Sequence, residues 1–251
     1  MNPFATCVVV FGCVFGGALL GMALRALLPE DHFSSDSKEA VRLGMGLVAT
    51  TVALVLGLLI ASAKGFYDTQ NTEMTEAAAN IVLLDRILVH YGAEANGARA
   101  VLRNTVASLI ERTWQHDDKG QTRFDPTTAN GEVIWDKIQE LAPTTENQRS
   151  LRTQALELAI QLGRVRWLMF EQKSSALPRP LLVILVAWLT LLFMSFGLFI
   201  RPNLTVVISL LASSLAVCSA IFLILEMFRP YVGLIQVSDA PLRAALAQLG
   251  Q

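Results

Sequence analysis

The feature that most constrains this chain is a set of four long runs without any charged residue. They span residues 4–24, 43–63, 180–200 and 202–225. Each run is about 21 to 24 residues long, and about 20 apolar residues form a helix that crosses the bilayer core. Only 16% of the 251 residues are charged, against roughly a quarter in soluble domains. The sequence therefore predicts four transmembrane helices.

The polar segments between these runs divide the chain into two membrane hairpins and a long middle region. Arg201-Pro202 joins the third run to the fourth almost without a gap, since proline suits the first turn of a helix and cannot continue one. We expect a first transmembrane hairpin at residues 1–63 and a water-exposed helical bundle at 64–179. A second hairpin is expected at 180–226, followed by a C-terminal tail with a short helix at 227–251.

The middle region has the pattern of helices. Tyr67, Met74, Ile81 and Leu88 recur every seven residues and continue from the second run, with only Gly65 as a weak point. Further helices are predicted at about 95–114 and 132–141, and a capping box at Thr145 and Gln148 begins a long final one. No strand pattern is found. The predicted fold is an all-α membrane protein whose second helix continues from the membrane into the bundle.

The sequence contains no recognisable set of catalytic residues. The net charge of −1 argues against nucleic-acid binding. Phosphate loops, His-Glu-x-x-His and Gly-x-Ser-x-Gly are absent. His116 lies beside Asp117 and Asp118, but no further ligand has metal-site spacing, which favours a solvated loop. The cysteines lie inside the predicted spans and are expected to be small buried residues: Cys7, Cys13 and Cys218. We therefore predict no enzyme, no metal and no cofactor.

The informative feature is one stripe along the second helix. Its members are Thr51, Val55, Leu58, Ser62 and Phe66 in the membrane, then Thr69, Glu73, Glu76 and Asn80 beyond it. One interpretation has small packing residues followed by a solvated face. The other has a pore lining with an apolar constriction and a polar vestibule. A pore needs several copies, because four helices are too few for a wide conduit.

Two charged residues lie at the ends of spans. Arg25 follows the first run and Glu226 follows the fourth. Both are within about a turn of the expected interface, where they are interpreted as anchors. Arg229 lies three residues after Glu226, and we expect the two to pair.

Two segments together resemble bacterial bestrophin-like membrane proteins. The first contains Ala79-Asn80 and Leu84-Asp85-Arg86; the second contains Glu226, Arg229-Pro230, Tyr231 and Gly233. Met227-Phe228 stands where the family tends to have an acidic residue. On this resemblance Asp85, Arg86, Glu226, Arg229 and Pro230 form the structural motif.

The resemblance implies a homo-oligomeric ion channel, pentameric by analogy, with passive permeation along a pore lined by the second helix. The implied partners are the lipid bilayer, further copies of the chain and inorganic ions. Glu73 and Glu76 at the exit would repel anions, which favours cations or argues against their facing the pore. Lysines and arginines near the span ends number five against four and barely favour either side. The resemblance implies an inner-membrane, multi-pass protein with its bundle and both termini in the cytoplasm.

Two other functional classes stay open. A non-conducting, membrane-anchored helical module that binds partners or senses stress would have an exposed apolar surface on its bundle. An ion-driven energy transducer would need a titratable group near the middle of a span. None of the four runs contains such a group, so a transducer would need a partner protein to supply it.

Overall fold

The computed structural model describes residues 3–27, 35–114, 130–172, 179–200 and 203–250. Within these residues all regular secondary structure is helical, as predicted. Four helices are long and apolar enough to cross a membrane, and they contain the described parts of the four charge-free runs except Ile200 and Asn203. The predicted loop residues His32, His116, Asp117, Asp118 and Arg201-Pro202 lie outside the described residues.

The four apolar helices are α1 (Pro3–Leu27), α2 (Ser35–Tyr91), α6 (Arg179–Phe199) and α7 (Leu204–Met227). A 3-10 turn, η2 (Ala93–Ala95), leads into α3 (Asn96–Trp114). The remaining helices are α4 (Asn130–Gln139), α5 (Glu146–Gln172) and α8 (Ala240–Gln248). The helix predicted at 132–141 therefore begins and ends two residues earlier than expected.

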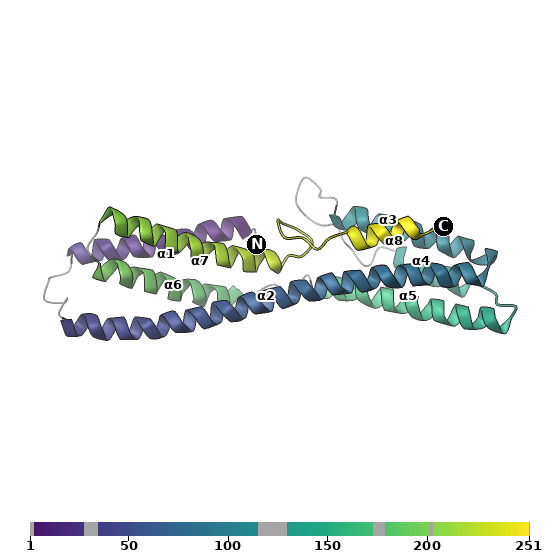
Figure 1. Cartoon of the computed structure of the whole chain (residues 1–251), viewed down its shortest axis with the longest axis horizontal. Coiled ribbons are helices and arrows are strands. Elements are labelled where there is room, and N and C mark those ends of the chain that lie inside the picture. Colours follow the sequence, from purple (N-terminus) through teal and green to yellow (C-terminus); the bar gives the residue numbers. More distant parts are fainter. Residues whose placement is uncertain (1–2, 28–34, 115–129, 173–178, 201–202, 251) are drawn as a thin grey trace. The chain divides into compact units, whose positions relative to one another are not determined.

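Helix α2 is a single element of 57 residues (Figure 1). It contains both the second charge-free run and the polar stretch after it, and Gly65 does not interrupt it. A lone glycine costs a helix about 1 kcal/mol, which the periodic apolar contacts on either side offset. The predicted continuity of the second helix is confirmed.

The chain forms two compact units. The membrane unit comprises Met1–Gly65 and Leu177–Phe228, and the bundle unit comprises Phe66–Ala176 and Arg229–Gln251. The boundary falls within α2, so this helix contributes one half to each unit. The C-terminal stretch belongs to the bundle unit because its apolar residues pack into the core of that unit.

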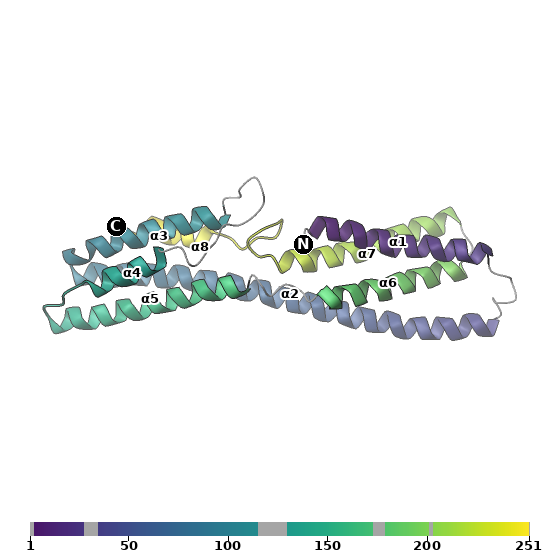
Figure 2. The same cartoon turned by 180° about the vertical axis from the view of Figure 1, so that it is seen from behind.

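The membrane unit is held together by a close approach of α1 and α6, which lie side by side in both side views (Figures 1 and 2). A Cβ atom at Gly21 would lie 2.0 Å from the carbonyl oxygen of Met194, and one at Gly197 would lie 2.1 Å from that of Ala18. Only glycine fits at such distances. Gly17 and Gly21 form the Gly-x-x-x-Gly spacing that lets membrane helices approach closely.

Helix α7 also packs on α1. The Cys7 sulfur lies 3.8 Å from the carbonyl oxygen of Cys218, and the Cys218 sulfur lies 3.5 Å from that of Cys7. Helices α1 and α6 come from different predicted hairpins, so the closest contact joins segments distant in sequence. The hairpins themselves stay a prediction, because their connections at 28–34 and 201–202 lie outside the described residues.

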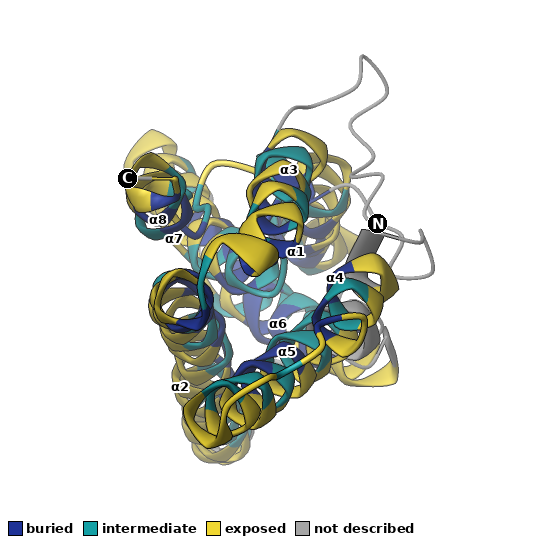
Figure 3. Cartoon of the chain, turned by 90° about the vertical axis from the view of Figure 1, so that its right-hand side faces the viewer, coloured by how far each residue is buried: buried dark blue, intermediate teal, exposed yellow. Residues whose placement is uncertain are grey.

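The bundle unit surrounds a core shared by α2, α3, α4, α5 and α8. Its most completely buried side chains include Met74, Leu84, Leu88, Ile138 and Leu242. In the end-on view buried segments lie on the inner sides of the helices, and exposed segments on their outer sides (Figure 3). At the start of α5, the Gln148 backbone N–H donates to Thr145 Oγ1 at 3.1 Å. The Gln148 side chain accepts from the Thr144 N–H instead of that of Thr145, so the capping box is half formed.

Candidate functional site

The membrane half of α2 is the least buried of the four apolar helices. Only 11% of its most apolar stretch is buried, against 28 to 39% for α1, α6 and α7. Four of its leucines are more than 70% exposed: Leu43, Leu47, Leu54 and Leu58. Its inward contacts come from a narrow row that includes Val52, Leu59 and Ala63. Most of this helix is therefore available to lipid or to another protein.

The predicted pore-lining residues lie on one flank of that inward row. Leu58 and Ser62 are exposed, whereas Thr51, Val55 and Phe66 are half-buried against the helices of their own chain. The Thr51 hydroxyl donates to the Leu47 carbonyl oxygen at 2.9 Å, so its hydrogen-bond donor is already satisfied within the helix. Leu58 and Ser62 are the exposed members of the part of the stripe that lies in the membrane half.

Beyond the membrane half the stripe divides in the same way. Thr69 and Glu76 are exposed, while Glu73 and Asn80 are half-buried. The buried Gln70 side chain donates to Glu73 Oε2 at 3.2 Å, which holds this carboxylate toward the bundle core. Leu58, Ser62, Thr69 and Glu76 are separated by four, seven and seven residues, and this spacing keeps them on one helix face.

A second exposed row on α2 was not predicted. It consists of small residues at spacings of three and four, which are Gly46, Thr50, Ala53, Gly57, Ala61 and Gly65. A Cβ atom at Gly46, Gly57 or Gly65 would meet nothing within 4 Å. The signal was present in the sequence as repeated small-x-x-x-small spacing, which is typical of helix contacts in membranes. These residues are exposed, so the row is not covered by the described helices.

Asp85 of the family motif forms an ion pair with α3. Arg99 Nε donates to Asp85 Oδ1 at 2.8 Å, and Arg99 Nη2 donates to Oδ2 at 3.1 Å. The Asp85 side chain is 3% exposed, and the hydrogen bond raises the pKa of Arg99. This bidentate pair joins α2 to α3, and Arg99 was missed because its partner lies fourteen residues away. Arg86, the neighbouring motif residue, is exposed.

The second motif segment follows α7. Glu226 is buried at the end of that helix, Arg229 is half-buried and Pro230 is buried. The expected pairing of Glu226 with Arg229 stays a prediction. Gly233 has a φ of 121°, a conformation that side chains other than glycine rarely adopt.

Hydrogen bonds fasten this segment to α2 and α3. The Tyr231 hydroxyl donates to Gln70 Oε1 at 2.8 Å, and the Tyr67 hydroxyl donates to the Gln236 carbonyl oxygen at 3.1 Å. Trp114 Nε1 donates to the Val237 carbonyl oxygen at 2.9 Å. Burial raises the pKa of Tyr231, and the negative charge of Glu73 raises it further. The motif after α7 is therefore part of the bundle unit's packing.

The remaining predictions concern Arg25, the cysteines and a metal site. Arg25 Nη1 donates to the Leu198 carbonyl oxygen in the last turn of α6 at 3.3 Å, so the expected anchor also binds a helix C-terminus. Of the three cysteines expected to be buried, Cys218 is buried and Cys7 is half-buried. Cys13 is exposed, and its expected burial is wrong because it lies on an outward face of α1. Within the described ranges, no three His, Cys, Asp or Glu side chains form a group suited to a metal ion.

Comparison with known proteins places this architecture in a family. The sequence model of the Bestrophin-like domain matches residues 12–242, which is nearly the whole chain. No curated protein and no solved structure gives a significant match. Together with the four apolar helices, the match indicates a membrane protein. The chain belongs to the bestrophin-like family.

Proposed function

We propose that several copies of this chain assemble into an ion channel, with the exposed stripe of α2 lining a central pore. Five copies are expected by analogy with bestrophins, a family that includes ion channels. The observation that carries the proposal is the low burial of the membrane half of α2. One half of α2 is packed into the bundle of its own chain, and the other half is exposed. The exposed half can therefore pack against the same helix of other copies around a symmetry axis.

Within this proposal the two exposed rows of α2 have different tasks. Leu58 and Ser62 face the pore, and Leu58 forms a ring of apolar side chains that gates by excluding water. The row of small residues, which includes Gly57 and Ala61, lets neighbouring copies of α2 approach closely. Thr69 and Glu76 line a polar vestibule beyond the constriction. The carboxylate of Glu76 favours cations there, since it would repel anions.

The remaining parts of the proposal concern topology. The chain crosses the inner membrane four times as two hairpins, with the bundle and both termini in the cytoplasm. Lipid covers the outer faces of α1, α6 and α7, where large apolar side chains such as Leu20, Val183 and Leu215 are exposed. The conducted species are inorganic ions, and no cofactor takes part.

The decisive experiment is ion flux into liposomes that contain the purified protein. Sodium and chloride gradients are imposed in turn, and flux is compared with empty liposomes. Leu58→Ala removes three carbon atoms from each side chain of the proposed apolar ring, so we expect faster flux through a wider, more easily wetted constriction. Leu215→Ala on α7 is the matched control, since this leucine is also exposed but belongs to another helix. It should leave flux unchanged.

A second candidate is a non-conducting membrane-anchored module that binds protein partners. One observation favours it: the bundle unit exposes large apolar side chains, among them Leu83, Ile160, Trp167 and Leu234. Such side chains are common at interaction surfaces. Absence of flux from protein shown to be folded and inserted, in both wild type and Leu58→Ala, would exclude the channel and favour this module.

A further inference from the structure

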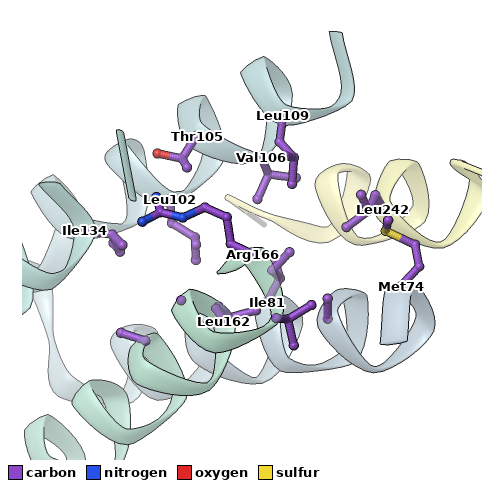
Figure 4. Close-up of a pocket in the computed structure, with 14 residues that line it drawn as sticks. Met74, Ile81, Leu102, Thr105, Val106, Leu109, Ile134, Leu162, Arg166 and Leu242 are labelled. Carbon is purple, nitrogen blue, oxygen red and sulfur yellow. The ribbon is translucent and has the colours of Figure 1, made fainter. Parts of the chain in front are cut away.

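The bundle unit contains an apolar cavity that the proposed channel does not use. Its volume is about 110 Å³, and α2, α3, α4, α5 and α8 all contribute to its walls (Figure 4). Most of the lining is hydrocarbon, with Met74, Leu102, Leu109, Ile134 and Leu242 among the residues that form it. An apolar cavity of roughly 150 Å³ holds a benzene molecule. This cavity therefore has room for a small apolar group of a few carbon atoms.

Among the described residues, one charged side chain takes part in this lining. Arg166 of α5 extends across the cavity, and its guanidinium lies near Leu102 and Ile134 (Figure 4). Its Nε atom is buried and has no hydrogen-bond partner among the described residues. Among the described residues that line the cavity there is no carboxylate, and Thr105 supplies the other polar side chain. Buried donors without a partner are rare in folded proteins.

The combination of an apolar wall and an unsatisfied guanidinium donor points to one ligand chemistry. We propose that the cavity binds a carboxylate on a short alkyl tail. The planar guanidinium matches a carboxylate with two parallel hydrogen bonds, which would engage the buried Nε of Arg166. The tail fills the space between Met74, Leu109 and Leu242. The volume limits the tail to a few carbon atoms, so the ligand is a free short-chain acid and not a membrane lipid.

The first test measures binding to the full-length protein in lipid nanodiscs. Hexanoate, hexanol and dodecanoate are titrated by calorimetry, with empty nanodiscs subtracted to remove partition into lipid. We expect hexanoate to bind about tenfold more tightly than hexanol, because a charge-assisted hydrogen bond contributes this much. Equal affinities for the acid and the alcohol, or no binding of either, would overturn the proposal. Tighter binding of dodecanoate would overturn the limit to short tails.

Three variants test the roles of the charge and the space. Arg166→Met keeps an apolar stem but removes the charge, so hexanoate should lose its advantage while hexanol still binds. Arg164→Gln is the matched control, because Arg164 is exposed on the same helix and does not line the cavity. Gly163 lines the cavity, and a Cβ atom there would meet nothing within 4 Å. Gly163→Leu should therefore fill the space and abolish binding of both ligands.

The readouts separate a binding role from a structural one. Helical content and thermal unfolding of each variant are recorded by circular dichroism, so that a folding defect is visible. A folded Arg166→Met protein that retains the preference for hexanoate contradicts the proposal. Equal losses of hexanoate affinity in Arg166→Met and Arg164→Gln also contradict it, because they would reflect net charge and not this cavity. Conduction is not part of the measurement, so failure of the proposed channel leaves the test intact.

Discussion

The two halves of α2 differ in how much of their surface is buried by the rest of the chain. In the bundle half one face is sealed in a core, with Met74, Leu84 and Leu88 almost completely buried. In the membrane half Leu54 and Leu58 are more than 70% exposed, and a Cβ atom added at Gly57, in the row of small residues, would meet nothing within 4 Å. Both halves are regular helix in one unbroken element. Helix formation and helix burial are therefore independent properties along this segment.

The difference has a physical cause. In water an exposed leucine is unfavourable, so the bundle half must bury its apolar face to be stable. In lipid the surroundings are as apolar as leucine, and helices associate through close packing and hydrogen bonds instead. Within the membrane unit this packing is satisfied between α1 and α6, at Gly21 and Gly197. The small residues of α2 remain open for contacts that the single chain does not supply.

The largest expected effect contrasts two leucines of α2. Leu84→Ala in the bundle half should lower the free energy of unfolding by about 2 to 5 kcal/mol, because it leaves a cavity at a fully buried position. Leu54→Ala in the membrane half should change it by about 0.5 kcal/mol or less, because this side chain is 75% exposed. Thermal unfolding of both variants in the same detergent measures the difference. Equal losses would contradict the contrast between the halves.

A smaller effect is expected at the hydrogen bond between Tyr231 and Gln70. Tyr231→Phe leaves the Gln70 side-chain oxygen buried without this donor, which should lower the free energy of unfolding by about 1 kcal/mol at neutral pH.

The Tyr231 hydroxyl also predicts how the free energy of unfolding depends on pH. The pKa of Tyr231 is raised in the folded protein above the ordinary tyrosine value of about 10. The folded state then holds this proton more tightly than the unfolded state. This contribution to stability is complete below pH 10 and is lost as the pH rises above it. The free energy of unfolding, measured between pH 9 and 11, should fall more steeply in wild type than in Tyr231→Phe. Parallel curves would show that Tyr231 does not titrate in this way.

The smallest effect on folding is expected at Gly57. Gly57→Leu should not reduce helical content, because the position is open and leucine favours helix more than glycine does. If the small row lies between copies, the bulkier side chain should weaken assembly by about tenfold, as measured by mass photometry in nanodiscs. Gly12→Leu on α1 is the control, because a Cβ atom at Gly12 also meets nothing within 4 Å. Equal assembly in both variants would leave the small row without a role.

Local pattern was sufficient for most of the fold. Charge-free length predicted the four apolar helices, and the seven-residue repeat from Tyr67 to Leu88 predicted the continuity of α2. Both are properties of neighbouring residues, since a helix forms from its own backbone hydrogen bonds. The stripe on α2 was also found by period, but the half-burial of Thr51, Val55 and Glu73 depends on helices distant in sequence. The helical repeat shows which residues share one face of a helix, but it does not show which other helix packs against that face.

The sequence by itself determined the helices, their capacity to span a membrane and the resemblance to bestrophin-like proteins. Only the tertiary structure paired α1 with α6 through Gly21 and Gly197, joined Asp85 to Arg99 and placed Arg166 beside an apolar cavity. These contacts join segments whose spacing along the chain carries no periodic signal. They are decided by which helix faces fit together, and that fit depends on the shapes of both partners at once.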